Sequence, residues 1–201
     1  IYSIFKDREG NFWFGGAEHG ISMFQGRTFQ SFNIDFGASG DGVRGITKDR
    51  NRNIWLATNA YVSKFKEPDS KLLLSESELN FIEKINNETG ITARSVWAMM
   101  TDNLGHVWFG GVGGLYKFDG KRYERFSDRK EFFGDAVMRI YQDKNNVIWF
   151  LSFSGVSCYD TEKDSLFMPF DEKSPFYKKR IASVYHHSNG DYWFGHSEGL
   201  T

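Results

Sequence analysis

Tryptophan recurs at nearly regular intervals along the 201 residues of this chain, each time within a similar short segment. The intervals are 42, 53, 41 and 44 residues, and the anchors are Trp13, Trp55, Trp108, Trp149 and Trp193. Six residues before each of the first four anchors lies an aspartate. A period of this length is the signature of a repeat protein, so a single repeat has to be interpreted before the whole chain.

Each Asp-x-x-Gly segment before a tryptophan predicts a tight turn between two strands. The aspartate accepts hydrogen bonds from backbone N–H groups two residues on, and the glycine or asparagine supplies the positive φ that closes the turn. In the second repeat Arg52 takes the glycine position, so we expect Asn51 or Asn53 to take over the bend and this turn to be less regular. In the fifth repeat His187 replaces the aspartate, and we interpret it as a turn residue.

Short segments rich in apolar residues surround each turn. The segments IYSIF, VRGIT, VWAMM, VMRIY and IASVY precede the turns, and the tryptophan segments follow them. A third element follows at 20–24, 61–65, 114–118 and 155–159, and a fourth at 27–32, 80–85, 121–126 and 165–170. Four short antiparallel strands per repeat are typical of a β-propeller blade. The sequence therefore predicts an all-β propeller with each tryptophan packed between neighbouring blades.

The repeat also predicts how the chain is divided. The blades cover approximately residues 1–36, 37–90, 91–133, 134–176 and an incomplete 177–201, about four and a half blades in all. Because propellers close with 4–8 blades, we expect a fragment of a larger ring. The long second interval places about ten extra residues within 66–80, which we interpret as a longer outer hairpin.

Charge and composition exclude several functions. The chain carries 25 Lys and Arg against 26 Asp and Glu, a net charge of -1, and has no basic stripe, which argues against nucleic acid as a partner. The sequence contains no apolar run of roughly 18–20 residues, so we predict no direct membrane insertion by this segment. The single cysteine, Cys158, cannot form an internal disulfide and is interpreted as a small buried apolar residue.

Motifs that would indicate catalysis or a cofactor are missing from the sequence. The five histidines lack a compact metal-ligand spacing, and His186 and His187 would point to opposite faces of a strand. The glycine-rich stretches lack a phosphate-loop lysine, and there is no Gly-x-Ser-x-Gly motif. We therefore predict no catalytic residue, no metal site, no cofactor and no enzyme activity for this segment.

Propellers commonly bind ligands over the central channel, so the candidate binding residues are those near the start of each inner strand. These residues are Asp41, Arg44, Arg94, Trp97, Asp135, Arg139, Lys179 and Arg180. Their arginines and carboxylates could hold an acidic or neutral sugar through charged hydrogen bonds, with Trp97 as a stacking platform. The alternative is that these charges pair across blades or are solvated.

The pattern V-x-x-I-x-x-D-x-x-G-x-x-W-x-G, followed by G-[LI]-x-x-[FY], resembles the two-component regulator propeller repeat. Residues 96–118 carry it most fully, and Ala57, Tyr61, Leu151 and His187 depart from it. The resemblance implies a piece of a seven-bladed propeller from the sensor region of a hybrid two-component regulator of the Bacteroidetes type.

It also implies a periplasmic location and a glycan, oligosaccharide or other small-molecule ligand. A homodimer formed through the parent receptor is a further expectation, with the histidine kinase lying outside this segment. Two alternatives stay open, a protein-interaction or dimerisation scaffold and a metal-dependent propeller lyase similar to the streptogramin lyases.

Overall fold

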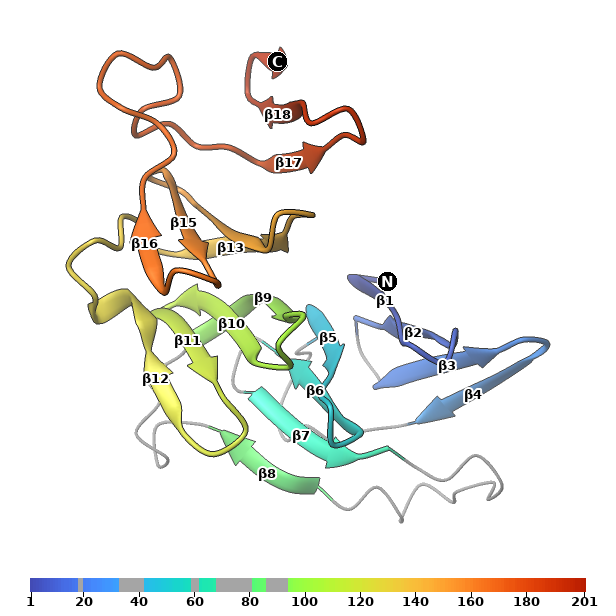
Figure 1. Ribbon diagram of the computed structural model, residues 1–201. Coiled ribbons are helices and arrows are strands. Elements are labelled where there is room, and N and C mark those ends of the chain that lie inside the picture. The colour runs from blue at the N-terminus through green and yellow to red at the C-terminus, as the bar shows by residue number, and fades with distance from the viewer. Residues whose placement is uncertain (18–19, 33–41, 59–61, 68–80, 86–93) are drawn as a thin grey trace.

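A computed structural model describes residues 1–17, 20–32, 42–58, 62–67, 81–85 and 94–201 (Figure 1). It contains four four-stranded sheets and one three-stranded sheet, all antiparallel. Within each sheet the strands pair in chain order, so each sheet is a meander. The all-β class predicted from the repeat is confirmed. Within the described ranges no helix is long and apolar enough to cross a membrane.

The strands of the five sheets follow the repeat. The first two sheets contain β1 (Ser3–Lys6), β2 (Phe12–Gly15), β3 (Ile21–Gln25) and β4 (Thr28–Phe32), then β5 (Gly45–Lys48), β6 (Asn53–Ala57), β7 (Val62–Lys66) and β8 (Phe81–Ile85). The third contains β9 (Arg94–Thr101), β10 (Val107–Val112), β11 (Gly114–Phe118) and β12 (Tyr123–Arg125). The last two contain β13 (Val137–Gln142), β14 (Val147–Ser152), β15 (Val156–Asp160) and β16 (Ser165–Phe167), then β17 (Ser183–His186), β18 (Tyr192–His196) and β19 (Gly199–Leu200).

The turn aspartates hold the tryptophans as well as the turns. In each of the first four repeats one carboxylate oxygen accepts a backbone N–H from four residues on, at 2.8–3.0 Å. The other oxygen accepts the indole N–H of the tryptophan anchor, also at 2.8–3.0 Å. The predicted bond from the backbone N–H two residues on forms at Asp49 and Asp143. The spacing of six residues therefore reflects a bond between the carboxylate and the indole, which the sequence analysis missed.

The turn of the second repeat is regular, contrary to expectation. Arg52 itself takes the positive φ, at 61°, and neither neighbouring asparagine does. The backbone bonds that close this turn, at 3.0 and 3.2 Å, match those of the first repeat, at 2.9 and 3.1 Å. An ion pair from Arg52 Nε to Glu67 at 2.9 Å and the Asp49 bonds to Asn53 hold the conformation against its steric cost.

The hydrophobic core is divided into layers between neighbouring sheets. Trp13 packs with Ile54, Leu56 and Phe65 of the second sheet, and three further clusters join the later pairs of sheets in the same way. The first three tryptophan anchors are fully buried and Trp149 is 7% exposed. At roughly 150–250 Å² of aromatic surface each, such burial contributes roughly 4–6 kcal/mol of transfer free energy. The predicted packing of tryptophan between blades is confirmed for these four repeats.

Two outer strands end earlier than predicted. Strand β12 ends at Arg125, because the fully buried Phe126 begins the 3-10 helix η3 (Phe126–Asp128) and meets the Trp108 ring edge-on at 4.8 Å. Strand β16 ends at Phe167, before Pro169, which has no N–H to donate to a ladder. The predicted insertion at 66–80 lies, from residue 68 on, outside the described residues.

Candidate functional site

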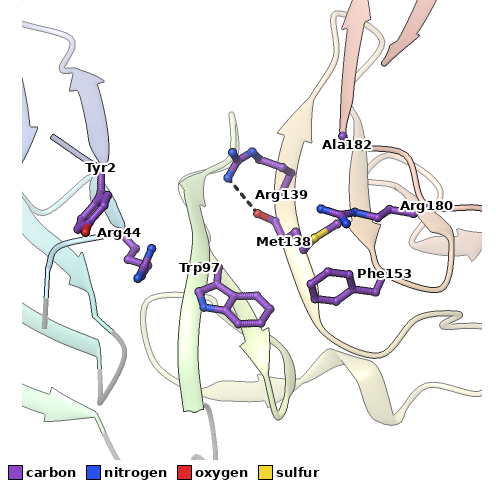
Figure 2. A pocket seen from close by; sticks show the side chains of 8 residues that line it. All are labelled: Tyr2, Arg44, Trp97, Met138, Arg139, Phe153, Arg180 and Ala182. Carbon is purple, nitrogen blue, oxygen red and sulfur yellow. Dashed lines mark hydrogen bonds between the residues drawn. The ribbon is translucent and has the colours of Figure 1, made fainter. Parts of the chain in front are cut away.

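The beginnings of the five inner strands converge on one pocket. It encloses about 430 Å³ and draws its lining from all five sheets: Tyr2, Arg44, Trp97, Met138, Arg139, Phe153, Arg180 and Ala182 (Figure 2). This volume is within the range of roughly 300–1,000 Å³ that is typical of small-molecule sites. A ligand bound here would lie against every sheet of the described fold.

The pocket brings together four of the eight predicted site residues, namely Arg44, Trp97, Arg139 and Arg180. Lys179 instead lines a neighbouring cavity of about 290 Å³, where Phe176 and His196 also lie. Arg180 is shared by the two cavities. Three of the predicted arginines therefore line one pocket together with Trp97, while Lys179 lines the neighbouring cavity.

Asp135 does not line the pocket. Its carboxylate accepts a hydrogen bond from Ser154 Oγ at 3.2 Å on the exposed surface. Partial burial would raise the pKa of Asp135, but hydrogen bonds from backbone N–H groups, including that of Ala136, and from Ser154 lower it on balance. Asp41 and the side chain of Arg94, whose backbone begins β9, lie outside the described residues.

One position of the repeat supplies a lining residue from every sheet. It lies eleven residues before each tryptophan anchor and is occupied by Tyr2, Arg44, Trp97, Met138 and Ala182. In the last four repeats the preceding residue is a valine or isoleucine with no exposed surface. Because successive residues of an extended strand point to opposite sides, burial of that residue turns the next one toward the pocket.

Three of the lining residues at this position, Tyr2, Met138 and Ala182, are not among the predicted site residues. The prediction covers the start of each inner strand but names only charged residues and Trp97. The residue directly after the first valine or isoleucine of each inner strand segment would have located one lining residue per sheet. Phe153 lies in the segment after β14, where the sequence predicts no site residue.

Two β-bulges shape the pocket wall. The ladder between β9 and β10 skips Trp97, and the ladder between β13 and β14 skips Met138. An unpaired residue bends its strand and redirects its side chain, and bulges are common beside functional sites. Beside Trp97, Ser95 has a φ of 47°, and a Cβ on Gly111 would lie 2.0 Å from the Ser95 carbonyl oxygen. The glycine is therefore needed for the close approach that places Trp97.

Positive charge dominates the lining. The Arg44 Cζ lies 4.7 Å from the centre of the Tyr2 ring, and the Arg180 Cζ lies 4.9 Å from that of Phe153. Arg139 donates from Nη1 to the Met138 carbonyl at 3.3 Å (Figure 2). No Asp or Glu lines this pocket among the described residues. Stacking on a ring fixes the plane of a guanidinium group and so aligns its N–H donors for an anionic ligand.

The rest of the lining is mostly apolar. The rings of Trp97 and Phe153 meet edge to face, with centroids 5.8 Å apart and an interplanar angle of 88°. Phe153 is 43% exposed and Tyr2 is 54% exposed. Aromatic rings that stay accessible inside a concave site offer surface against which the apolar side of a ligand can pack.

The other candidates for chemistry have structural roles. His186 is buried and stacks on Tyr192 at 4.3 Å, whereas the exposed His187 bonds to Asn189 Oδ1 at 2.7 Å in its turn. The two rings therefore lie in different environments, as predicted. Cys158 is a buried free thiol whose pKa is raised by burial. In the part of the chain that the structure describes, no group of three His, Cys, Asp or Glu residues is placed to hold a metal.

Comparison with known proteins supports the fold and the repeat. Residues 1–18 match the family model described as "Two component regulator propeller", which confirms the resemblance predicted from the repeats. The chain therefore carries a repeat of this family in its first blade. No curated protein is a match for the sequence.

Solved structures similar to this chain are propellers from several systems. The extracellular domain described as that of a hybrid two component system from B. thetaiotaomicron is 23% identical over 98% of this chain and 32% of that chain, with a TM-score of 0.55. PorZ, a surface component of the type-IX secretion system of Porphyromonas gingivalis, is 20% identical over 98% and 31%, with a TM-score of 0.71. A streptogramin B lyase is 13% identical over 98% and 66%, with a TM-score of 0.63.

These likenesses establish the propeller fold. The chain spans about a third of the length of the first two structures. The predicted blade boundaries and the predicted seven-bladed ring stay predictions.

Proposed function

We propose that this chain is part of the ligand-sensing propeller of a two-component signalling receptor, and that its pocket binds a glycan or oligosaccharide. The observation that carries the proposal is the convergence of all five sheets on one pocket lined by arginine and aromatic side chains. The matching repeat and the extracellular domains of two-component systems among the similar structures support the same function. In this proposal the segment is periplasmic, it has no enzyme activity of its own, and a histidine kinase lies outside it.

A pocket shared by several sheets suits a sensor. Each sheet contributes at least one side chain to the lining, so a bound ligand would link sheets that are otherwise joined only to their neighbours. Binding energy would then favour one relative placement of the sheets, and such differential binding is the thermodynamic requirement for a signal.

Calorimetry of the intact protein against a panel of neutral and acidic oligosaccharides tests the proposal. We expect saturable binding that is weakened at least tenfold by Trp97→Ala. Trp193→Ala is the matched control, because Trp193 is 44% exposed on the fifth sheet and does not line the pocket. Absence of binding to every saccharide, or equal losses in the two variants, would overturn the proposal.

An interaction scaffold is the second candidate function. It is favoured by large apolar side chains exposed on the first and fifth sheets, which are Ile4, Phe29, Tyr185, Trp193 and Leu200, 44–69% exposed. One similar propeller structure is described as YCF48 bound to D1 peptide. A solution mass that rises with protein concentration would favour this candidate over a monomeric sensor.

A further inference from the structure

The three arginines of the pocket point to the chemical class of its ligand. We infer that the pocket selects an anionic saccharide, one that carries carboxylate or sulfate groups, and that Arg139 and Arg180 hold such a group. The inference rests on the proposed function, since it names the kind of saccharide that the same pocket takes.

The charge balance of the pocket is the first argument. Arg44, Arg139 and Arg180 line it, and the described residues contribute no carboxylate to the lining. The one predicted site carboxylate that the structure describes, Asp135, accepts a hydrogen bond from Ser154 outside the pocket. A concave site lined by one sign of charge raises the local concentration of oppositely charged ligands. A neutral sugar would leave the charges of Arg139 and Arg180 without a counter-charge from the described lining.

The second argument is that two of the arginines have donors to spare. Arg139 bonds to the carbonyl of its own neighbour, Met138, and Arg180 stacks on Phe153. Neither forms an ion pair with a carboxylate within the ranges that the structure describes. A guanidinium group presents five N–H donors in a planar fork that matches carboxylate and sulfate oxygens. An anion between Arg139 and Arg180 would use donors that the described protein leaves available.

The aromatic residues argue for a saccharide among possible anions. In Figure 2 Trp97 lies between the Tyr2–Arg44 pair and the Phe153–Arg180 pair. The lining therefore combines guanidinium groups with aromatic surface. An acidic sugar has an apolar ring face beside its charged substituent and so complements both parts, whereas a bare inorganic anion would leave the aromatic surface exposed to water.

Lysine would serve this site less well than arginine. A lysine ammonium is a point charge, whereas arginine both stacks on a ring and bonds an anion through two parallel N–H groups. Arg180 already makes the stacking contact with Phe153. We therefore expect Arg180→Lys to lose much of the affinity for an acidic sugar although the net charge is unchanged.

Calorimetry with matched ligands tests the inference. The probes are trigalacturonate, its carboxyl-reduced neutral counterpart and a sulfated disaccharide, each titrated into the intact protein at low and at high salt. We expect binding of at least one charged probe, no binding of the neutral counterpart, and weaker binding at high salt. Comparison of the two charged probes separates a carboxylate ligand from a sulfate ligand.

Variants of the pocket arginines complete the test. Arg139→Gln and Arg180→Gln should each weaken binding of the charged probe roughly ten- to a hundredfold, since hydrogen bonds to charged groups are lost. Arg122→Gln is the matched control, because Arg122 is an exposed arginine beside β12 that does not line the pocket. Unchanged thermal melting of the three variants shows that folding is intact.

The outcomes separate the inference from the proposed function. If the neutral sugar binds as tightly as its charged counterpart, and Trp97→Ala abolishes both, the pocket is a sugar site and the anionic inference is wrong. If only a non-saccharide anion such as citrate binds, and its binding depends on the arginines, the inference that the ligand is a saccharide is wrong. If a folded protein binds none of these probes, both proposals are overturned.

Discussion

Removal of the buried carboxylate Asp102 tests how the repeats are held together. This side chain is 1% exposed, and its Oδ2 accepts the Trp108 indole N–H at 2.8 Å and faces His106 Nδ1 at 3.0 Å. Its Oδ1 accepts the His106 backbone N–H at 2.8 Å. The variant Asp102→Ala therefore removes the acceptor of one fully buried indole and one turn N–H.

The expected cost follows from the burial of each donor. Trp108 has no exposed surface, so water cannot replace the lost acceptor, and an unsatisfied buried donor costs about 1–3 kcal/mol. His106 is partly exposed, so water can replace the lost acceptor, and the loss of its two hydrogen bonds costs less, about 0.5–1.5 kcal/mol each. These contributions sum to about 2–6 kcal/mol, so we expect Asp102→Ala to lower the free energy of unfolding by about 4 kcal/mol.

Urea unfolding followed by tryptophan fluorescence measures this change. The fifth repeat offers the control, because His187 occupies the same position, is exposed, and makes no bond to Trp193 among the described contacts. His187→Ala should change stability by less than about 0.5 kcal/mol. A loss below about 1 kcal/mol for Asp102→Ala, or equal losses for the two variants, would refute the argument that the carboxylate fixes the buried indole.

Three further predictions concern the contacts between sheets. A Cβ on Gly110 would lie 2.7 Å from the Cβ of Val137, so Gly110→Ala should destabilise the protein by about 1–3 kcal/mol in urea unfolding, and a neutral result would show that the sheets can separate. The Lys117 Nζ lies 5.3 and 5.5 Å from aromatic rings of two neighbouring sheets, so Lys117→Met should cost about 1 kcal/mol, and an unchanged melting temperature would contradict a cation–π role. Burial raises the pKa of Asp7, but bonds from Trp13 and Asn11 and the charge of Lys48 lower it on balance below 3.8. The stability that Asp7 contributes is therefore complete above its unfolded pKa and is lost as the pH falls through the lower folded value, and acid unfolding that is unchanged in Asp7→Asn would contradict this.

The fold was predictable because it depends on residues that repeat. The tryptophan, the aspartate six residues before it and the apolar segments around them recur in register, and each has the same role in each of the first four sheets. The errors fall where the sequence departs from the repeat. Arg52 adopts the glycine conformation, because the bonds of Asp49 and Glu67 around it outweigh a local steric penalty. Such tertiary compensation cannot be inferred from one residue and its neighbours.

The candidate site was only half predictable because its residues differ in every repeat. At the position eleven residues before each tryptophan the repeat places tyrosine, arginine, tryptophan, methionine and alanine. In the last four repeats the fixed residues around that position bury the preceding valine or isoleucine and so set the direction of the variable side chain, whatever its chemistry. The two bulges then shift Trp97 and Met138 out of the regular ladder, a displacement that no spacing rule predicts.

Because the pocket residues and the residues that hold the fold occupy different positions of the repeat, one scaffold can present different pockets. Replacement of a residue eleven positions before a tryptophan changes the pocket lining but touches neither the carboxylate–indole bonds nor the layers between sheets, which involve other positions. Specificity can therefore vary at little cost to stability. Arg139 and Arg180 line the pocket and also lie outside those bonds and layers. Binding and folding are therefore distinguishable by experiment in this chain, since variants of Arg139 or Arg180 should change affinity while those of the turn aspartates should change unfolding.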